Sequence, residues 1–277
     1  MTDNIVEPMD DQLMVGDAVF SIHREKATAD IKEGGKPDLI AINIPHSPVV
    51  EQYKAIFTEL DRHCQRLGKK IIAVTSALQG EGKTATVANL AVVAARNFGR
   101  KCLLIDAHFK RPSIANLFRL GRGLGLIDVM MQRRSLEDVL IPSSIENLTL
   151  LPMGHFLGKR AEMLNVNGLK DVFTKIRGEY YNILWNEDCD DFLQMEQQEV
   201  DLFDYIFVDS PPTPSPEMAM ISEATDFLLM VVRAESAPKE IVQQAVKRLD
   251  SSKLIGAILN VAPISTRAKN YGYWYHR

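Results

Sequence analysis

Hydrophobic positions from about residue 69 onward form short apolar runs that alternate with segments of helical periodicity. Six runs have the length and composition of strands, and two segments between them have the spacing of helices. The strands are expected at Ile71–Val74, Lys101–Ile105, Leu148–Leu151, Tyr205–Val208, Phe227–Val232 and Leu254–Leu259, and the helices at Lys83–Asn97 and Lys239–Leu249. Near-continuous apolar strands with helical crossovers are typical of parallel sheets covered on both faces. The pattern therefore predicts an α/β fold with a mostly parallel central sheet.

One more helix is expected ahead of the sheet, at Ser47–Leu67. Ser47 can cap its first turn, and Pro48 suits the first helical position because that position needs no N–H donor. One apolar face recurs at helical spacing and consists of Val50, Tyr53, Ile56, Phe57 and Leu60.

The pattern divides the chain into three parts. Residues 1–45 are weakly patterned and are interpreted as a flexible tail or linker, residues 46–265 as one domain, and residues 266–277 as a mobile C-terminal tail. Two segments interrupt the alternation of strands and helices. Gly121–Pro142 contains Gly-rich turns and a short helix, and Gly178–Val200 is polar and acidic with no readable function.

Composition narrows the class of protein. The chain has 277 residues, 46% of them hydrophobic, and a net charge of −4, which argues against an electrostatic nucleic-acid binder. Its three cysteines are few and widely spaced, which favours a reducing compartment over a disulfide framework or a metal site. No apolar stretch reaches the roughly 18 residues that span a bilayer. The acidic N-terminus does not resemble a signal peptide, so a cytoplasmic protein is expected.

The strongest motif follows the first predicted strand and runs from Thr75 to Thr84. Two glycines let backbone N–H groups converge on phosphate oxygens, and the following helix directs its positive dipole end at them. Lys83 can reach the β- and γ-phosphates, and the Thr84 hydroxyl can ligate Mg²⁺. The expected nucleotide-binding residues are Gly80, Glu81, Gly82, Lys83, Thr84 and Ala85, with ATP and Mg²⁺ as cofactors. The alternative is a Gly-rich turn with an incidental Gly-Lys-Thr, since Ala77 replaces the usual first glycine.

Two acidic residues end predicted strands on the same sheet edge. Asp106 follows one apolar run and Asp209 another. Ligands bind at the carboxyl edge of open parallel sheets, where carboxylates can hold Mg²⁺ directly or through water. Either residue alone is also a common helix cap or turn residue. Together with the phosphate loop they predict a P-loop NTPase in which Thr84, Asp106 and Asp209 lie on the metal side.

From Ser47 to the C-terminus the chain resembles the bacterial tyrosine kinases, which belong to the same wide class as partitioning and cell-division-site ATPases. Four segments carry the resemblance: Ser76–Thr84, Leu103–Pro112, Arg160–Leu164 and Phe207–Pro212. The resemblance implies ATP-dependent tyrosine autophosphorylation that regulates exopolysaccharide synthesis or export. It also implies that Lys83, Asp106 and Asp209 are catalytic, with Asp106 as the base that activates the tyrosine hydroxyl.

The end of the chain resembles the tyrosine cluster that such kinases phosphorylate on a neighbouring subunit. It contains Tyr271, Tyr273 and Tyr275, and Gly272 favours mobility. The alternative is that these aromatic side chains dock on the core. The resemblance also implies a homo-oligomer and a separate membrane-embedded polysaccharide co-polymerase or activator that recruits the chain to the inner face of the membrane.

The sequence departs from the family pattern in three places. Gln79 replaces a proline in the phosphate loop, and His108 replaces the second acid of the Asp-x-Asp motif. A neutral histidine supplies no negative charge to a Mg²⁺ shell, although it can accept a proton. The family's assembly motif, Glu-x-x-Arg-x-x-Arg, reads Glu51, Lys54 and Phe57 here, so a ring would need different contacts, and Phe57 can equally pack in the core.

Two other functions compete with the kinase. A partitioning-type ATPase switch usually carries a signature lysine five residues before the loop lysine, where this chain has Leu78. It also often has a basic amphipathic C-terminal helix, and none is visible here. A nucleotide-binding scaffold without transfer activity would be consistent with Gln79, Phe57 and His108.

Overall fold

The computed structural model describes residues 19–22, 39–68, 70–154, 166–176 and 202–261. Within them the strands are β1 Val19–Ile22, β2 Ile71–Ser76, β3 Cys102–Asp106, β4 Ile141–Pro142, β5 Leu148–Leu151, β6 Tyr205–Asp209, β7 Phe227–Arg233 and β8 Leu254–Asn260. The helices are α1 Ile40–Asn43, α2 Pro48–Leu67, α3 Lys83–Phe98, α4 Ile114–Leu117, α5 Leu126–Met130, α6 Val166–Ile176, α7 Pro216–Ala224 and α8 Lys239–Lys247. All six predicted strands and the three predicted helices are present, with ends that differ by at most two residues.

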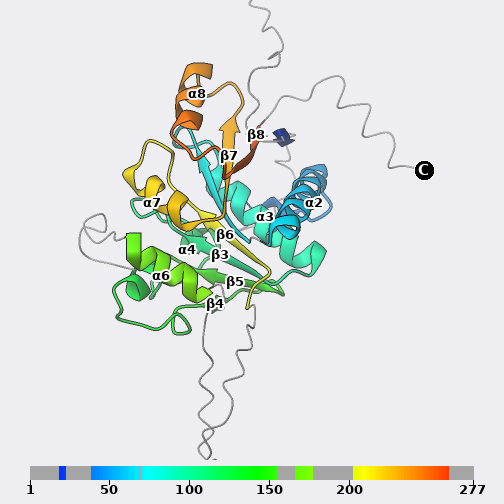
Figure 1. Ribbon diagram of the computed structural model, residues 1–277. Coiled ribbons are helices and arrows are strands. Elements are labelled where there is room, and N and C mark those ends of the chain that lie inside the picture. Colours follow the sequence, from blue (N-terminus) through cyan, green and yellow to red (C-terminus); the bar gives the residue numbers. More distant parts are fainter. Residues whose placement is uncertain (1–18, 23–38, 69, 155–165, 177–201, 262–277) are drawn as a thin grey trace, which may run out of the picture.

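The strands form one sheet in the order β1-β8-β7-β2-β6-β3-β5-β4. Every pairing is parallel except that of β4 with β5. Helices lie on both sides of the sheet (Figure 1), which confirms the predicted α/β class. Because β2, β6 and β3 are adjacent and parallel, their carboxyl ends share one edge of the sheet. The phosphate loop begins there, and Asp106 and Asp209 are the last residues of β3 and β6.

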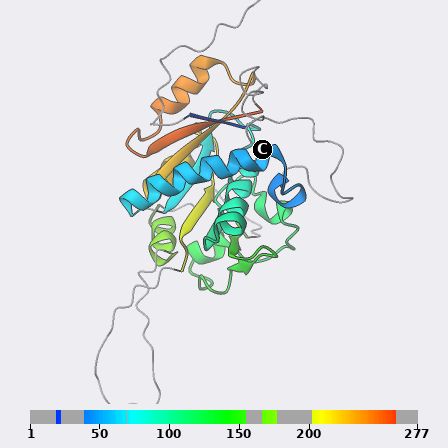
Figure 2. The same ribbon diagram turned by 90° about the vertical axis from the view of Figure 1, so that its right-hand side faces the viewer.

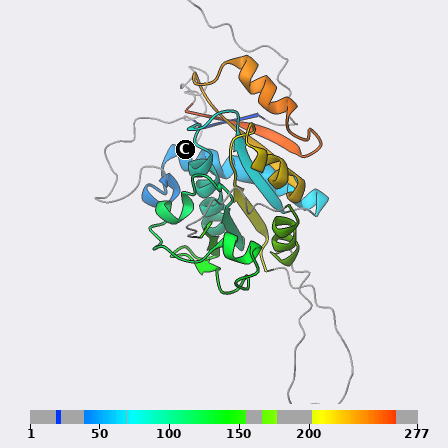
Figure 3. The same ribbon diagram turned by 90° about the vertical axis from the view of Figure 1, so that its left-hand side faces the viewer.

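Alternate residues of each central strand enter two separate cores. Ile72 and Val74 of β2 face the core that contains α2 and α3, whereas Ile71 and Ala73 face the core that contains α5, α6, α7 and α8. Figure 2 shows α2 lying across the first face, and Figure 3 shows α6 and α7 on the opposite face. Burial on both faces explains why the strands read as continuous apolar runs.

Helix α2 begins and ends as its sequence predicts. The Ser47 side chain accepts a hydrogen bond from the Val49 N–H at 3.2 Å, Pro48 occupies the first turn, and Gly68 closes the helix with φ of 61°. Phe57 is fully buried and packs on Phe98 at a ring-centroid distance of 4.7 Å. The core alternative for Phe57 is therefore confirmed. None of the helices in the described ranges has the length and apolar character needed to cross a bilayer.

The region before residue 46 contributes two short elements that the sequence did not predict. β1 pairs in parallel with β8 and extends the sheet at its edge. α1 packs against α3, where the Ala41 N–H donates to Asn89 Oδ1 at 2.8 Å. Each element has only four residues, too few to show a period, and each depends on a neighbour from elsewhere in the chain. The domain limits at residues 45 and 265 stay a prediction.

Candidate nucleotide-binding site

The phosphate loop connects the end of β2 at Ser76 to the start of α3 at Lys83. Gly80 and Gly82 have φ of 83° and 96°, in the left-handed region that side chains with a Cβ rarely adopt. Within the described part of the chain, the N–H groups of Gly80, Glu81 and Gly82 have no protein acceptor. Three free donors in succession beside a helix N-terminus form the kind of concave site that binds phosphate oxygens.

The first turn of α3 supplies the rest of the predicted cradle. Lys83 is buried, and its Nζ donates to Ser76 Oγ at 3.0 Å. Burial lowers the Lys83 pKa, while the charges of Asp209 and Glu81 partly oppose that effect. The N–H groups of Lys83, Thr84 and Ala85 precede the first intrahelical hydrogen bond, which joins the Thr86 N–H to the Gly82 carbonyl at 2.9 Å. An anion could therefore accept from them.

The Glu81 side chain is engaged in hydrogen bonds to the protein rather than free to contact a nucleotide. It is completely buried, and one carboxylate oxygen accepts from the Leu78 N–H at 2.6 Å. The other oxygen accepts from the Arg233 N–H at 3.2 Å. Because the protein occupies both oxygens, any nucleotide contact of Glu81 would come from its main chain.

Asp106 and Asp209 are brought together as predicted, since they are paired residues on the neighbouring strands β3 and β6. Asp209 Oδ2 accepts from the Thr84 hydroxyl at 2.6 Å, whereas Asp209 Oδ1 is buried without a hydrogen-bond partner in the structure. Burial, followed by the charge of Asp106, raises the pKa of Asp209 to about 8, against the effects of Thr84 and Lys83. Burial and the charge of Asp106 thus disfavour the ionised form of Asp209, and a cation beside its unpartnered oxygen would favour it.

The Asp106 carboxylate is oriented by the chain that follows β3. Its Oδ1 accepts from the His108 N–H at 3.1 Å, and its Oδ2 accepts from the N–H groups of Ser113 and Ile114 at 2.8 and 2.9 Å. The Ser113 hydroxyl donates to Thr84 Oγ1 at 3.2 Å. Ser113 therefore joins the site although the sequence did not single it out. The only cue was its position as the cap of a four-residue helix.

The residues present fit a magnesium ion. The unpartnered Asp209 Oδ1 and the Thr84 hydroxyl are hard oxygen donors on one side of the loop, which are the ligands that Mg²⁺ prefers. No group of three or more His, Cys, Asp or Glu side chains forms a metal cage among the residues that the structure describes. Mg²⁺ usually binds through one or two protein groups plus substrate phosphates and water.

Two of the positions that depart from the family pattern, Gln79 and His108, contact the same residue, Arg111. His108 Nδ1 accepts from the Arg111 N–H at 3.1 Å. Burial, and then the positive charge of Lys83, lower the His108 pKa, so the imidazole is neutral at pH 7. When the Gln79 amide presents its oxygen to Arg111, it accepts from Nη1 at 2.7 Å. Gln79 and His108 are thus linked through the same arginine.

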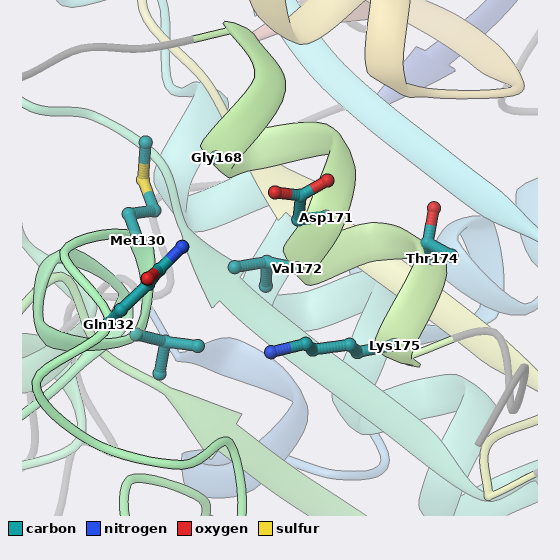
Figure 4. A pocket seen from close by; sticks show the side chains of 8 residues that line it. Met130, Gln132, Gly168, Asp171, Val172, Thr174 and Lys175 are labelled. Carbon is teal, nitrogen blue, oxygen red and sulfur yellow. The ribbon is translucent and has the colours of Figure 1, made fainter. Parts of the chain in front are cut away.

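A partly open hollow of about 190 Å³ lies elsewhere, between α5 and α6 (Figure 4). The figure shows Gln132 and Lys175 reaching into it from opposite sides. Its lining residues include neither Asp106 nor Asp209 nor any residue of the phosphate loop. The successive N–H donors and the unpartnered oxygen of Asp209 lie at the sheet edge and not at this hollow, which makes the sheet edge the candidate nucleotide site.

Several predicted residues fall outside the described ranges. They are the proposed acceptors Tyr271, Tyr273 and Tyr275, and the family-like segment Arg160–Leu164. Their placement and roles stay predictions. Of the assembly motif, Glu51 and Lys54 form an ion pair of 2.7 Å within α2.

Three comparisons with known proteins show what this chain is similar to. The family model described as "AAA domain" matches residues 69–255. The tyrosine-protein kinase YwqD of Bacillus subtilis (strain 168) is 30% identical over 240 residues, which cover 86% of this chain and 91% of that protein. The kinase domain of Escherichia coli tyrosine kinase ETK superposes with a TM-score of 0.67 at 22% identity, over 90% of this chain and 92% of that one.

The septum site-determining protein MinD of Pyrococcus horikoshii OT3, solved with Mg-ADP, has a TM-score of 0.55 at 21% identity over 72% of each chain. That likeness shows a shared fold alone, so it does not support the partitioning alternative. The match to YwqD extends over most of both proteins. The chain belongs to the bacterial tyrosine kinase family and is a P-loop protein-tyrosine kinase.

Proposed function

We propose that this kinase uses ATP with Mg²⁺ to phosphorylate the C-terminal tyrosines of a neighbouring subunit. The observation that carries the proposal is the buried Asp209, with one oxygen on the Thr84 hydroxyl and the other without a partner. Such an oxygen is costly to bury unless a cation completes its environment. The free N–H groups of the loop beside it support a triphosphate as the molecule that brings that cation.

The proposed reaction is an in-line transfer of the γ-phosphoryl group. A new bond forms between the tyrosine oxygen and the γ-phosphorus, the bond from that phosphorus to the β,γ-bridging oxygen breaks, and ADP leaves. The tyrosine proton passes to the Asp106 carboxylate, which three backbone N–H groups hold in place. The Lys83 ammonium lies where it can offset negative charge that develops on the phosphate oxygens. Mg²⁺, when bound by Thr84 and Asp209, would neutralise further phosphate charge.

Incubation with ATP and Mg²⁺ followed by phosphotyrosine detection tests the reaction. Wild type should give a signal that Lys83→Met abolishes and that the triple change of Tyr271, Tyr273 and Tyr275 to phenylalanine removes. Phenylalanine at both Tyr180 and Tyr181, the adjacent tyrosine pair elsewhere in the chain, is the matched control and should leave the signal. A signal that persists in Lys83→Met would refute the site, and one that persists in the triple variant would refute the acceptors.

Mixing two variants tests transfer between subunits. Lys83→Met carries intact tail tyrosines but an impaired site, while the triple phenylalanine variant carries an intact site without those acceptors. The mixture should phosphorylate the Lys83→Met subunit, although neither variant is phosphorylated alone. A wild-type signal whose rate per subunit is independent of protein concentration, together with an inactive mixture, would instead indicate transfer within one chain.

We also propose a membrane-embedded partner, a polysaccharide co-polymerase or activator that brings the kinase to the inner face of the membrane in exopolysaccharide synthesis or export. This proposal rests on the family. Membrane vesicles from the native host should raise the initial rate of autophosphorylation, and vesicles stripped of protein by protease should not. Equal rates of autophosphorylation with intact vesicles, with stripped vesicles and without vesicles would overturn the proposed partner.

A further inference from the structure

The phosphate loop is tied to the ends of β7 and β8 by two buried side chains. Asn260, the last residue of β8, is 4% exposed, and its Nδ2 donates to the Glu81 carbonyl at 2.8 Å. The Asn260 carbonyl accepts from the Ala234 N–H at 2.9 Å, so its own main chain is fixed. The loop peptide next to Gly82 is therefore held by a side chain that comes from 179 residues further along the sequence.

The Glu81 side chain forms the other half of this brace. Its carboxylate joins the Leu78 N–H inside the loop to the Arg233 N–H at the end of β7. Asn260 holds the carbonyl of the same residue. Glu81 is thus anchored by three hydrogen bonds, of which the one from Asn260 is buried and the two to its carboxylate are partly buried.

Gly82 shows how closely Asn260 approaches the loop. A Cβ atom built on Gly82 would overlap Asn260 Nδ2, and the Gly82 φ of 96° already disfavours any other residue. Space, backbone conformation and hydrogen bonding therefore all specify the Glu81–Gly82 peptide. That peptide lies within the stretch whose N–H groups have no protein acceptor and are available to phosphate oxygens.

We propose that Asn260 is a positioning residue of the nucleotide site, which acts through Glu81 to hold the loop N–H groups in the phosphate-binding conformation. The inference rests on the proposed nucleotide function of that loop. Without the amide donor, a buried carbonyl loses its partner and the loop must be ordered when the nucleotide binds. Nucleotide affinity should fall about tenfold, with little change in the chemical step, because Asn260 touches no reacting group.

Two variants and a control test this role. Asn260→Asp keeps the shape but removes the donor, and Asn260→Ala removes the side chain. Both should raise the Kd of a fluorescent ATP analogue and the KM for ATP about tenfold, while kcat stays within about threefold. Asn89→Ala removes another buried asparagine on α3, one that bonds the main chain of Ala41 and Ala85. It should lower the melting temperature without changing KM, which separates positioning from general stability.

A steric test uses the close approach directly. Gly82→Ala should abolish measurable binding of the analogue, and Gly82→Ala combined with Asn260→Gly should restore part of it, because the overlap with Nδ2 is removed. If both Asn260 variants bind the analogue with unchanged affinity, or if Asn89→Ala changes the affinity equally, the positioning role is overturned. Binding of the analogue by wild type would still uphold the nucleotide site in that case. Failure of wild type to bind the analogue would overturn both.

Discussion

Replacing Asp209 with asparagine should have opposite effects on the ligand-free protein and on its response to nucleotide. The carboxyl group is fully buried and paired in register with Asp106, and one of its oxygens has no partner among the residues that the structure describes. Asparagine keeps the shape and an oxygen that can accept from Thr84, but it removes the negative charge. The ligand-free variant should therefore be more stable than wild type at alkaline pH, whereas Mg²⁺ should no longer enhance nucleotide binding.

The pH dependence follows from the direction of the pKa change. The folded-state pKa of Asp209 is raised from 3.8 to about 8, so the native state holds the proton more tightly than the unfolded chain does. Its contribution to stability is fully present below about pH 4 and is lost as pH rises toward 8. One pKa unit corresponds to about 1.4 kcal/mol, so the loss at pH 8 is of the order of a few kcal/mol. The asparagine variant does not lose this stability, because it has no carboxyl group to ionise at this position.

Urea unfolding of both proteins at pH 5, 6.5 and 8, without nucleotide, measures the first effect. The difference in free energy of unfolding should grow with pH in favour of the variant, and Asp171→Asn on the exposed face of α6 should show no such trend. Thermal unfolding with ATP and Mg²⁺ measures the second. A ligand at 100 times its Kd stabilises by about 2.7 kcal/mol, and the Mg²⁺-dependent part should vanish in the variant. A variant less stable than wild type at pH 8 would refute the reasoning.

Three further outcomes are expected. Phe57→Ala should lower the free energy of unfolding, measured in urea, by about 3–5 kcal/mol because Phe57 is buried. The control Lys54→Arg should change that free energy by no more than about 0.5 kcal/mol. A Phe57→Arg variant that folds and forms a larger oligomer in light scattering would contradict the core assignment. Burial raises the Cys64 pKa to about 12, so iodoacetamide at pH 8 should label this thiol only after urea is added, and prompt native labelling counts against its burial. Thr84→Ala should weaken Mg²⁺-dependent nucleotide binding by calorimetry, and Thr84→Ser should retain it.

The sequence predicted the sheet and its loop because both are specified locally. Strands buried on two faces are continuous apolar runs, and a Gly-rich turn between such a strand and an Ala-rich helix is recognisable without any distant contact. Asp106 and Asp209 could be placed on one edge because the strand ends of a parallel sheet meet there. Their register as direct neighbours was added by the structure.

What the sequence did not predict depends on partners distant along the chain. Glu81 looked like a loop residue available to the nucleotide, but its carboxylate bonds the β7 end at Arg233. Asn260 ends an apolar strand and has no local motif, so its approach to Gly82 is visible only after the sheet is assembled. The sequence did not predict β1 either, because a four-residue segment forms a strand only when β8 offers an edge to pair with.

The effect of His108 on the site also depends on the assembled charges. An aspartate there would be a third carboxylate beside Asp106 and Asp209, and like charges raise one another's pKa values when buried. The charge of Asp106 already raises the pKa of Asp209. A neutral imidazole, fixed by the Arg111 N–H and kept uncharged by burial and Lys83, adds no repulsion. The substitution therefore reduces the attraction for Mg²⁺ but also reduces the cost of burying the two remaining carboxylates, and it leaves both the Asp106 carboxylate and the Thr84–Asp209 pair in place.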